Sequence, residues 1–429
     1  MRVLRRKNAF IAIVLAGVAT QGITAISGPL VARILGPSGR GEMVMVAVVA
    51  LLCSQLAVGG LPTAIAHAVG RQGAPARDVV RSELRRQALA SLLPGVIGAV
   101  AVVVLLHGTS PRVAALAVEG FVLTTCLVWQ FVLAGMLQGE GNVRRINVYR
   151  LFTLILYLGC VVVIFVVARD QQSVMMLAVY TSCTLAGLLV GFALLRHPLG
   201  VDAAVPSDEL RSFARLSYVS GAGVLDGLGI DLLLVGVFLG STELGLYSVA
   251  LSATNLTLIV LKGVAQVLLP RMAAAPSPAV ARALARRWVA ASAALDVMIV
   301  LGLQLIIDPV IRFAFGSQFV SVIPGARVLI VAWGLLAMRA VLVAVVQAFG
   351  YPGRASLIEL GCVAVLVAGV LIGGHVWGVN GAGLGMASAG LVSCVLLAGV
   401  IHRHPKDDLR PVGGFVATPD VGLEHTPEG

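Results

Sequence analysis

Charged side chains are scarce in this sequence. Asp, Glu, Lys and Arg make up only 12% of its 429 residues, whereas they approach about a quarter of a soluble globular protein. The apolar share is 59% and the mean hydropathy is +0.99, so a soluble globular chain is excluded. The same values exclude a disordered or fibrous chain.

Cysteine is also sparse and carries no motif. All six cysteines lie inside apolar stretches, where they act as small apolar residues, and the sequence has no CxxC pair or Cys/His cluster. We therefore predict neither a disulfide nor a metal site, and the sequence indicates no cofactor.

Long apolar stretches dominate what is present. A helix that spans a bilayer needs about 20 mostly apolar residues. Twelve stretches meet this need: Ala9–Val31, Met43–Ala68, Ala88–Leu106, Val113–Leu137, Leu151–Val167, Ser173–Leu195, Leu216–Leu239, Leu244–Leu269, Trp288–Ile307, Ala326–Ala348, Ala355–Ile372 and Trp377–Ile401. The basic start is similar to a secretory signal, but its apolar run is too long, so we expect an uncleaved first helix.

The basic residues indicate the orientation. With a cytoplasmic N-terminus, 23 of the 31 Lys and Arg residues fall on the cytoplasmic side, and Lys262 and Arg339 lie within spans. The other six fall outside: Arg33, Arg40, Arg112, Arg169, Arg312 and Arg327. Positively charged loops stay in the cytoplasm, so both termini are predicted to be cytoplasmic. These loops account for the net charge of +11 and attract anionic membrane lipids, so no nucleic-acid partner is needed.

No loop is long enough for a soluble catalytic domain. The longest internal loops, near 196–215 and 271–287, have about 20 residues, far below domain size. We expect an N-terminal six-helix bundle over 1–195, a cytoplasmic linker over 196–215 and a C-terminal six-helix bundle over 216–404. The Pro- and Gly-rich tail, 405–429, is predicted to be disordered and cytoplasmic.

Two short patterns recur in the two halves. Leu35, Gly36 and Gly41 match Leu239, Gly240 and Gly245 at an offset of 204 residues. In addition, the set Gln138, Gly141 and Arg145 matches a second set at an offset of 209, which consists of Gln347, Gly350 and Arg354. Both offsets equal six spans.

The fold class follows from this repeat. We predict an all-α polytopic membrane protein with twelve transmembrane helices in two six-helix bundles. Because six is even, both halves enter the membrane in the same direction, and a pseudo-two-fold axis along the membrane normal relates them. Such duplicated bundles are typical of transporters that move one half against the other around a site at their interface.

Several segments resemble one family. The ordered series resembles the oligosaccharide flippases (Wzx-like) of the multidrug/oligosaccharidyl-lipid/polysaccharide exporter superfamily, from Arg33 to about Arg354. Its members are Ala32–Gly41, Gly60–Ala64, Asp231 with Val237–Gly240, Leu244–Ala250, Gln266–Arg271 and Phe315–Phe319.

The resemblance implies a two-lobed, V-shaped bundle of six plus six helices. It also implies an activity, which is to flip a polyprenyl-diphosphate-linked oligosaccharide across the bacterial plasma membrane for polysaccharide biosynthesis and export. A glycan polymerase and other export components are the further partners that it implies.

Cations inside spans are the candidate substrate contacts. Arg339 lies about 20 Å into its span, near the midplane, and a guanidinium suits a diphosphate. Either Arg339 contacts the diphosphate or it pairs with an aspartate within the membrane. Lys262 lies about 10 Å from a span end and either contacts substrate or extends to the surface. Arg33, at the outer end of the first span, lines the outward mouth or is solvated.

Carboxylates inside spans are the candidates for ion coupling. Asp226 and Asp231 lie near the middle of the seventh span and Asp296 lies in the ninth. A buried carboxylate can carry a proton or pair with a cation, so a structural salt bridge is the alternative. Glu119 and Glu359 lie nearer span ends and are expected to reach water.

Other functions fit less well. A drug or small-metabolite antiporter of the same superfamily often has an acidic residue in its first span, and Ala9–Val31 has none. Typical lipid II flippases have two further helices. Major-facilitator transporters carry a Gly-x-x-x-Asp-Arg-type motif that 70–86 lacks. A membrane glycosyltransferase needs a sizeable outer loop, so we do not expect an enzyme.

Overall fold

A computed structural model describes residues 2–71, 76–108, 110–167, 172–195, 228–254, 256–273, 275 and 277–403. Within these ranges the chain is helical and contains no strand. The first six helices are α1 (Arg2–Val58), α2 (Leu61–Arg71), α3 (Ala76–Leu106), α4 (Val113–Gly139), α5 (Val143–Val167) and α6 (Ser173–Leu194).

The second half begins with α9 (Ile230–Leu239), α10 (Ser241–Thr254), α11 (Leu256–Ala273) and α12 (Pro278–Val310). A π-helical turn η1 (Ile311–Phe315) and a 3₁₀ turn η2 (Ser317–Val322) follow. The chain then forms α13 (Ile323–Ala348) and α14 (Pro352–Arg403). The predicted linker 196–215, the tail 405–429 and Asp226 lie outside the described residues.

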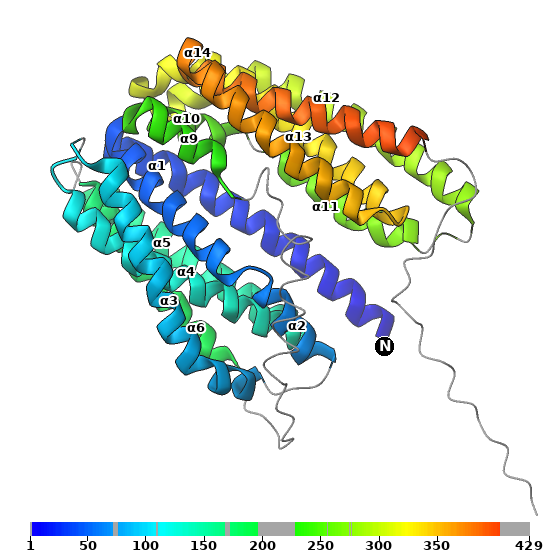
Figure 1. Cartoon of the computed structure of the whole chain (residues 1–429), viewed down its shortest axis with the longest axis horizontal. Helices are drawn as coiled ribbons and strands as arrows, with labels where there is room; N and C mark the ends of the chain where they lie inside the picture. The colour runs from blue at the N-terminus through cyan, green and yellow to red at the C-terminus, as the bar shows by residue number, and fades with distance from the viewer. Residues whose placement is uncertain are drawn as a thin grey trace, which may run out of the picture.

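The helices form two lobes (Figure 1). Helices α1 to α6 make the first lobe and α9 to α14 make the second. The long helix α1 lies between them and packs against α9, α10, η1 and η2 of the second lobe. The predicted fold class, an all-helical bundle of six plus six segments, is confirmed.

Two span boundaries differ from the expected ones. Span 1 and the first part of span 2 lie in the bent helix α1, where Gly36 has a φ of 64°, and span 2 continues into α2. Spans 11 and 12 lie in α14, which breaks at Trp377 and Gly378. A single glycine with positive φ turns the chain at each of these sharp bends, so the separate loops expected there are replaced by kinks.

Most helices are long and apolar enough to cross a bilayer. Seven helical segments of the described chain have the required length and composition, and three shorter apolar helices accompany them. Large apolar side chains point outward, including Leu305, Phe313 and Val167, which are 82%, 80% and 78% exposed. Such a surface is stable only against lipid, so the protein is an integral membrane protein.

Candidate functional site

The two lobes meet where the repeated glycine pattern lies. A side chain at Gly41 would collide with the backbone carbonyl of Ser241, and one at Gly245 would collide with that of Pro37. The contact is symmetric, because each glycine's Cβ position lies 3.1 Å from the backbone nitrogen of the other. Only glycine permits such backbone packing, so the glycine at each of these positions sets the distance between α1 and α10.

The matched glycines also share backbone conformations. Gly36 and Gly240 have φ values of 64° and 91°. Gly36 precedes the part of α1 that crosses α10, and Gly240 precedes α10. In the second pattern, Gly141 and Gly350 have φ values of 65° and 86°. Each of these two glycines lies in the same kind of turn, in which its amide donates to the carbonyl of a glutamine three residues earlier at 3.0 Å. The recurrent residues therefore form equivalent turns in the two lobes.

We call the end of the molecule at Gly36 and Gly240 the kinked end. Two arginines of α1 bond across the lobes there. Arg33 is exposed and donates to the carbonyl of Phe313 in η1. The Arg40 Nε donates to the Ser248 hydroxyl of α10 at 3.4 Å. Orientation predicted from the basic loops would make the kinked end the outer one.

Arg339 is buried inside the second lobe. It is 2% exposed and forms an ion pair with Glu359, so α13 and α14 are joined at this point. The sequence allowed an ion pair for Arg339, although with an aspartate. The expectation that Glu359 reaches water is wrong, because its side chain is only 15% exposed and faces α13. A buried guanidinium is costly unless a carboxylate pairs with it, and Glu359 supplies that carboxylate to Arg339.

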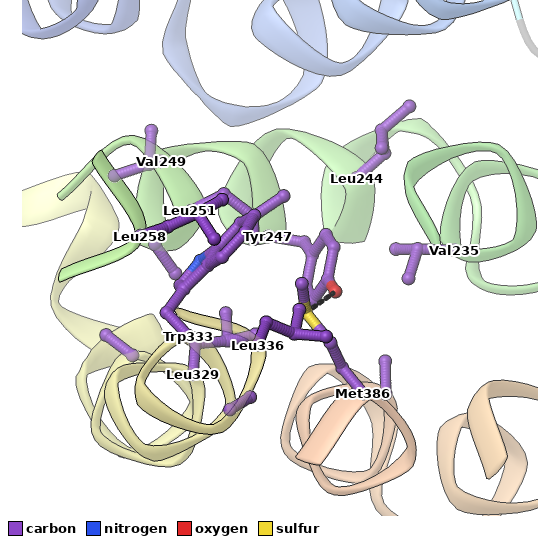
Figure 2. Packing of buried hydrophobic residues seen from close by; sticks show 14 of the residues in the cluster. Val235, Leu244, Tyr247, Val249, Leu251, Leu258, Leu329, Trp333, Leu336 and Met386 are labelled. Atoms are coloured by element: carbon purple, nitrogen blue, oxygen red, sulfur yellow. Dashed lines mark hydrogen bonds between the residues drawn. The ribbon is translucent and has the colours of Figure 1, made fainter. Parts of the chain in front are cut away.

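The described aspartates lie in separate places. Asp231, buried in the first turn of α9, accepts a hydrogen bond from the Tyr247 hydroxyl at 3.0 Å. That hydroxyl lies 3.7 Å from the sulfur of Met386 in α14. Figure 2 shows the Tyr247 ring among apolar side chains from α10, α13 and α14. The hydrogen bond between Tyr247 and Asp231 is thus a polar contact inside an otherwise apolar part of the second lobe.

Asp296 lies on α12 and faces α13. A Cβ at Gly334 would be 3.3 Å from one of its carboxylate oxygens, so the missing side chain makes room for it. Within the described residues, its buried Oδ1 has no hydrogen-bond partner. A carboxylate oxygen without a donor favours a bound proton or cation at this position.

Lys262 is partly buried on α11. Arg339 and Arg33 lie on other helices, α13 and α1. The predicted cationic contacts are therefore distributed over three places: Arg33 between the lobes at the kinked end, Arg339 inside the second lobe, and Lys262 on α11. Their roles toward a substrate stay predictions.

Sequence reasoning missed Arg40 and Glu42. It placed Arg40 in an outward loop, whereas this arginine lies in α1 beside the second lobe. Glu42 is 9% exposed and accepts a hydrogen bond from the Ser173 hydroxyl at the start of α6. The glycine pattern itself, which brackets Arg40, was the signal that could have located it at the crossing.

The comparisons with known proteins agree with this architecture. The family model described as polysaccharide biosynthesis protein matches residues 6–275. No curated protein matches the chain. Among solved structures, the chain resembles an inward-facing MATE family multidrug resistance transporter of the MOP superfamily, with 17% identity and a TM-score of 0.71. That alignment covers 89% of this chain and 94% of the other.

Two further structures have the same fold. The lipid II flippase MurJ, in an inward closed conformation, has 11% identity and a TM-score of 0.69, with 92% of this chain and 88% of that chain covered. A eukaryotic MATE transporter has 16% identity and a TM-score of 0.63, with 94% and 96% covered. At these identities the likeness shows the fold alone.

Proposed function

The chain belongs to the polysaccharide biosynthesis protein family and has the fold of MOP superfamily transporters, and from that premise we propose that it flips a polyprenyl-diphosphate-linked oligosaccharide across the bacterial plasma membrane. The observation that carries the proposal is the family match over residues 6–275. The likeness to MurJ, a lipid II flippase, supports a lipid-linked saccharide as the substrate class. The chain is a transporter and not an enzyme.

The contact between the lobes supports alternating access. The lobes meet through backbone packing at Gly41 and Gly245, through apolar contacts such as that of Met45 beside Gly236, and through single hydrogen bonds from Arg33 and Arg40. No buried ion pair is recorded between the described parts of the two lobes. An interface with so few polar links can separate at the kinked end while each lobe stays folded.

Asp231 and Asp296 are the proposed coupling residues among the described aspartates, and Asp226 is the third candidate. Transport against a gradient needs a carboxylate that binds and releases a cation. The Oδ1 of Asp296, which lacks a donor, supports that role most directly. Contact between Arg339 and the diphosphate requires its guanidinium to exchange Glu359 for the substrate, and Lys262 and Arg33 are proposed as further contacts.

The membrane setting is part of the proposal. We place the chain in the bacterial plasma membrane with both termini in the cytoplasm, where its basic loops meet anionic lipids. A glycan polymerase on the outer side would consume the flipped oligosaccharide.

The lipid-linked glycan pool of a deletion strain tests the function. We expect a complete oligosaccharide on polyprenyl diphosphate to accumulate on the cytoplasmic face, and the wild-type gene to restore the normal pool. Mass spectrometry of extracted polyprenyl diphosphates measures both. An unchanged pool in the deletion strain would contradict the proposal.

The second candidate is a drug antiporter, which the likeness to the multidrug MATE transporter favours. Under that candidate the deletion strain becomes sensitive to cationic drugs while its polyprenyl diphosphates stay unchanged. The same pair of strains therefore decides between the two.

A further inference from the structure

Four arginines gather where α11 ends and α12 begins. Arg271 lies two residues before the end of α11. Arg282, Arg286 and Arg287 lie in the first three turns of α12. We call these four residues the basic cluster. Arg282 is partly buried and the other three are exposed, and within the described residues no carboxylate forms an ion pair with any of them.

The ring of Trp288 joins the two helices at the basic cluster. The guanidinium carbon of Arg271 lies over this ring, 5.3 Å from its centroid, so an arginine of α11 rests on a side chain of α12. A cation–π contact fixes a guanidinium without a carboxylate, so its N–H groups remain available to a phosphate. Arg287 directly precedes Trp288, and both helices therefore supply arginines around one indole ring.

The length of α12 places the basic cluster at a membrane surface. From Trp288 to Val310 the helix rises about 33 Å at 1.5 Å per residue, which matches a hydrocarbon core of about 30 Å. Tryptophan is enriched at the boundary between this core and the head groups. The η1 turn that follows Val310 lies at the kinked end, so the basic cluster lies at the opposite end, at head-group level.

Two of the arginines lie on the lipid-facing side of α12. Leu305 lies 18 residues after Arg287, which is about five whole turns. Val297 lies 11 residues after Arg286, which is about three turns. Both apolar side chains are exposed on the surface that meets lipid. The apolar side of α12 therefore continues directly into the arginines of the basic cluster.

We propose that the basic cluster and Trp288 form a binding site for the head group of an anionic phospholipid, in the leaflet opposite the kinked end. Arg271, Arg286 and Arg287 bind the phosphate through charge-assisted hydrogen bonds, and Trp288 packs against the glycerol and the upper acyl chains. The site lies on the outside of the second lobe and apart from the lobe crossing. It therefore does not depend on which substrate the chain transports.

A lipid complements this surface better than a soluble anion does. Its phosphate meets the arginines while its acyl chains cover the exposed apolar side chains of the same helix face, such as Val297 and Leu305. A soluble anion would meet the charge alone. Basic residues at the ends of membrane helices attract anionic lipids through the same charge, and here Trp288 adds a fixed contact at the boundary.

Quenching of Trp288 by brominated lipid tests the site. The full chain is reconstituted in phosphatidylcholine with increasing mole fractions of phosphatidylglycerol brominated in the upper acyl chain, and brominated phosphatidylcholine forms the parallel series. Trp288→Phe, measured in the same way, gives the contribution of the other tryptophans. We expect phosphatidylglycerol to reach half-maximal quenching of Trp288 at a mole fraction at least about tenfold lower. Equal mole fractions for the two lipids would overturn the proposal.

Arginine variants show which side chains make the site. One basic residue near an anionic surface contributes a factor of about five. Arg271→Gln should therefore reduce the preference for phosphatidylglycerol about fivefold, and Arg286→Gln/Arg287→Gln should reduce it about twenty-fivefold. These side chains are exposed, so the variants should fold normally. An unchanged preference in both variants would overturn the proposal.

Arg354→Gln is the matched control. Arg354 is exposed and lies over the ring of Tyr351, 4.8 Å from its centroid. Helix α13 starts beside η2 at the kinked end, so Arg354, just beyond its other end, lies at the same end as the basic cluster. The variant removes the same charge from the same end, and the wild-type preference should remain. An equal loss in Arg354→Gln would mean that the whole surface attracts the lipid, and would overturn a defined site.

Glycerol 3-phosphate distinguishes a lipid head group from a free phosphate ester. An excess of it in the aqueous phase should leave the quenching of Trp288 by brominated phosphatidylglycerol unchanged. Relief of the quenching that disappears in Arg271→Gln would mean that the basic cluster takes a soluble phosphate, and would overturn the lipid as its ligand.

Discussion

Removal of Arg339 alone takes the ion-pair partner away from the mostly buried Glu359 carboxylate. Breaking one partner of such a pair costs about 3–5 kcal/mol, whereas replacing both by apolar residues is often neutral. Arg339→Met and Glu359→Met are therefore expected each to lower the melting temperature of the purified protein. The double variant should return close to the wild-type value.

Export by the double variant shows whether Arg339 does more than pair. If a normally folded double variant exports glycan at the wild-type level, Arg339 is not a substrate contact. Loss of export in that variant, at normal protein levels, would favour the predicted contact with the diphosphate. A double variant no more stable than either single variant would contradict the ion pair itself.

Asp296 offers the clearest test of ion coupling. Asp296→Asn removes the charge but keeps the shape, and it also removes a buried carboxylate oxygen without a donor. We expect the melting temperature to be unchanged or slightly raised, while glycan export falls at least about tenfold. Asp308→Asn, at an exposed pair with Arg327, is the control, and its export should be normal. Full gradient-driven export by Asp296→Asn would exclude Asp296 as the coupling residue.

At the scale of the helix, the crossing of α1 and α10 depends on two glycines. Gly245→Ala places a methyl group against the backbone of Pro37, which cannot move without shifting α1. We expect the lobes to separate at the kinked end, with each lobe still folded. Gly263→Ala on α11, where a Cβ meets nothing within 4 Å, is the matched control.

Spin labels report this separation directly. A label on each lobe near the crossing should show longer distances in Gly245→Ala and unchanged distances in Gly263→Ala. An unchanged distance in both variants would mean that α1 tolerates the methyl group by a local adjustment.

Local sequence features predicted the helices and the turns better than the contacts. Spans follow from apolar length, and Gly36, Gly141, Gly240 and Gly350 lie at turns because glycine favours positive φ. The pairing of Arg339 with Glu359 depends instead on how α13 and α14 rotate, which hydropathy does not encode. Arg40 was assigned to water because it interrupts two apolar stretches, although a long side chain can extend back into the bundle.

For the whole molecule, helix α1 makes most of the contacts between the described parts of the two lobes. Helix α1 packs against α9, α10, η1 and η2, and its two arginines supply the side-chain bonds across that interface. Transport then requires this contact to open once in each cycle.

A covalent link across the kinked end should therefore stop transport. In a background without the six native cysteines, Arg33→Cys and Phe313→Cys place thiols on opposite lobes at two exposed positions. A short bifunctional thiol reagent should join them and block glycan export, and a reagent cleaved by reductant should return export to the level of the same variant before linking. The control is the pair Asp308→Cys and Arg327→Cys, which lies within the second lobe and should export normally when joined. Both pairs are exposed and carry the same modification, so the two proteins differ only in whether the link joins the two lobes. Normal export by a fully joined Arg33→Cys/Phe313→Cys protein would mean that the kinked end stays closed throughout the cycle, and would contradict alternating access in this chain.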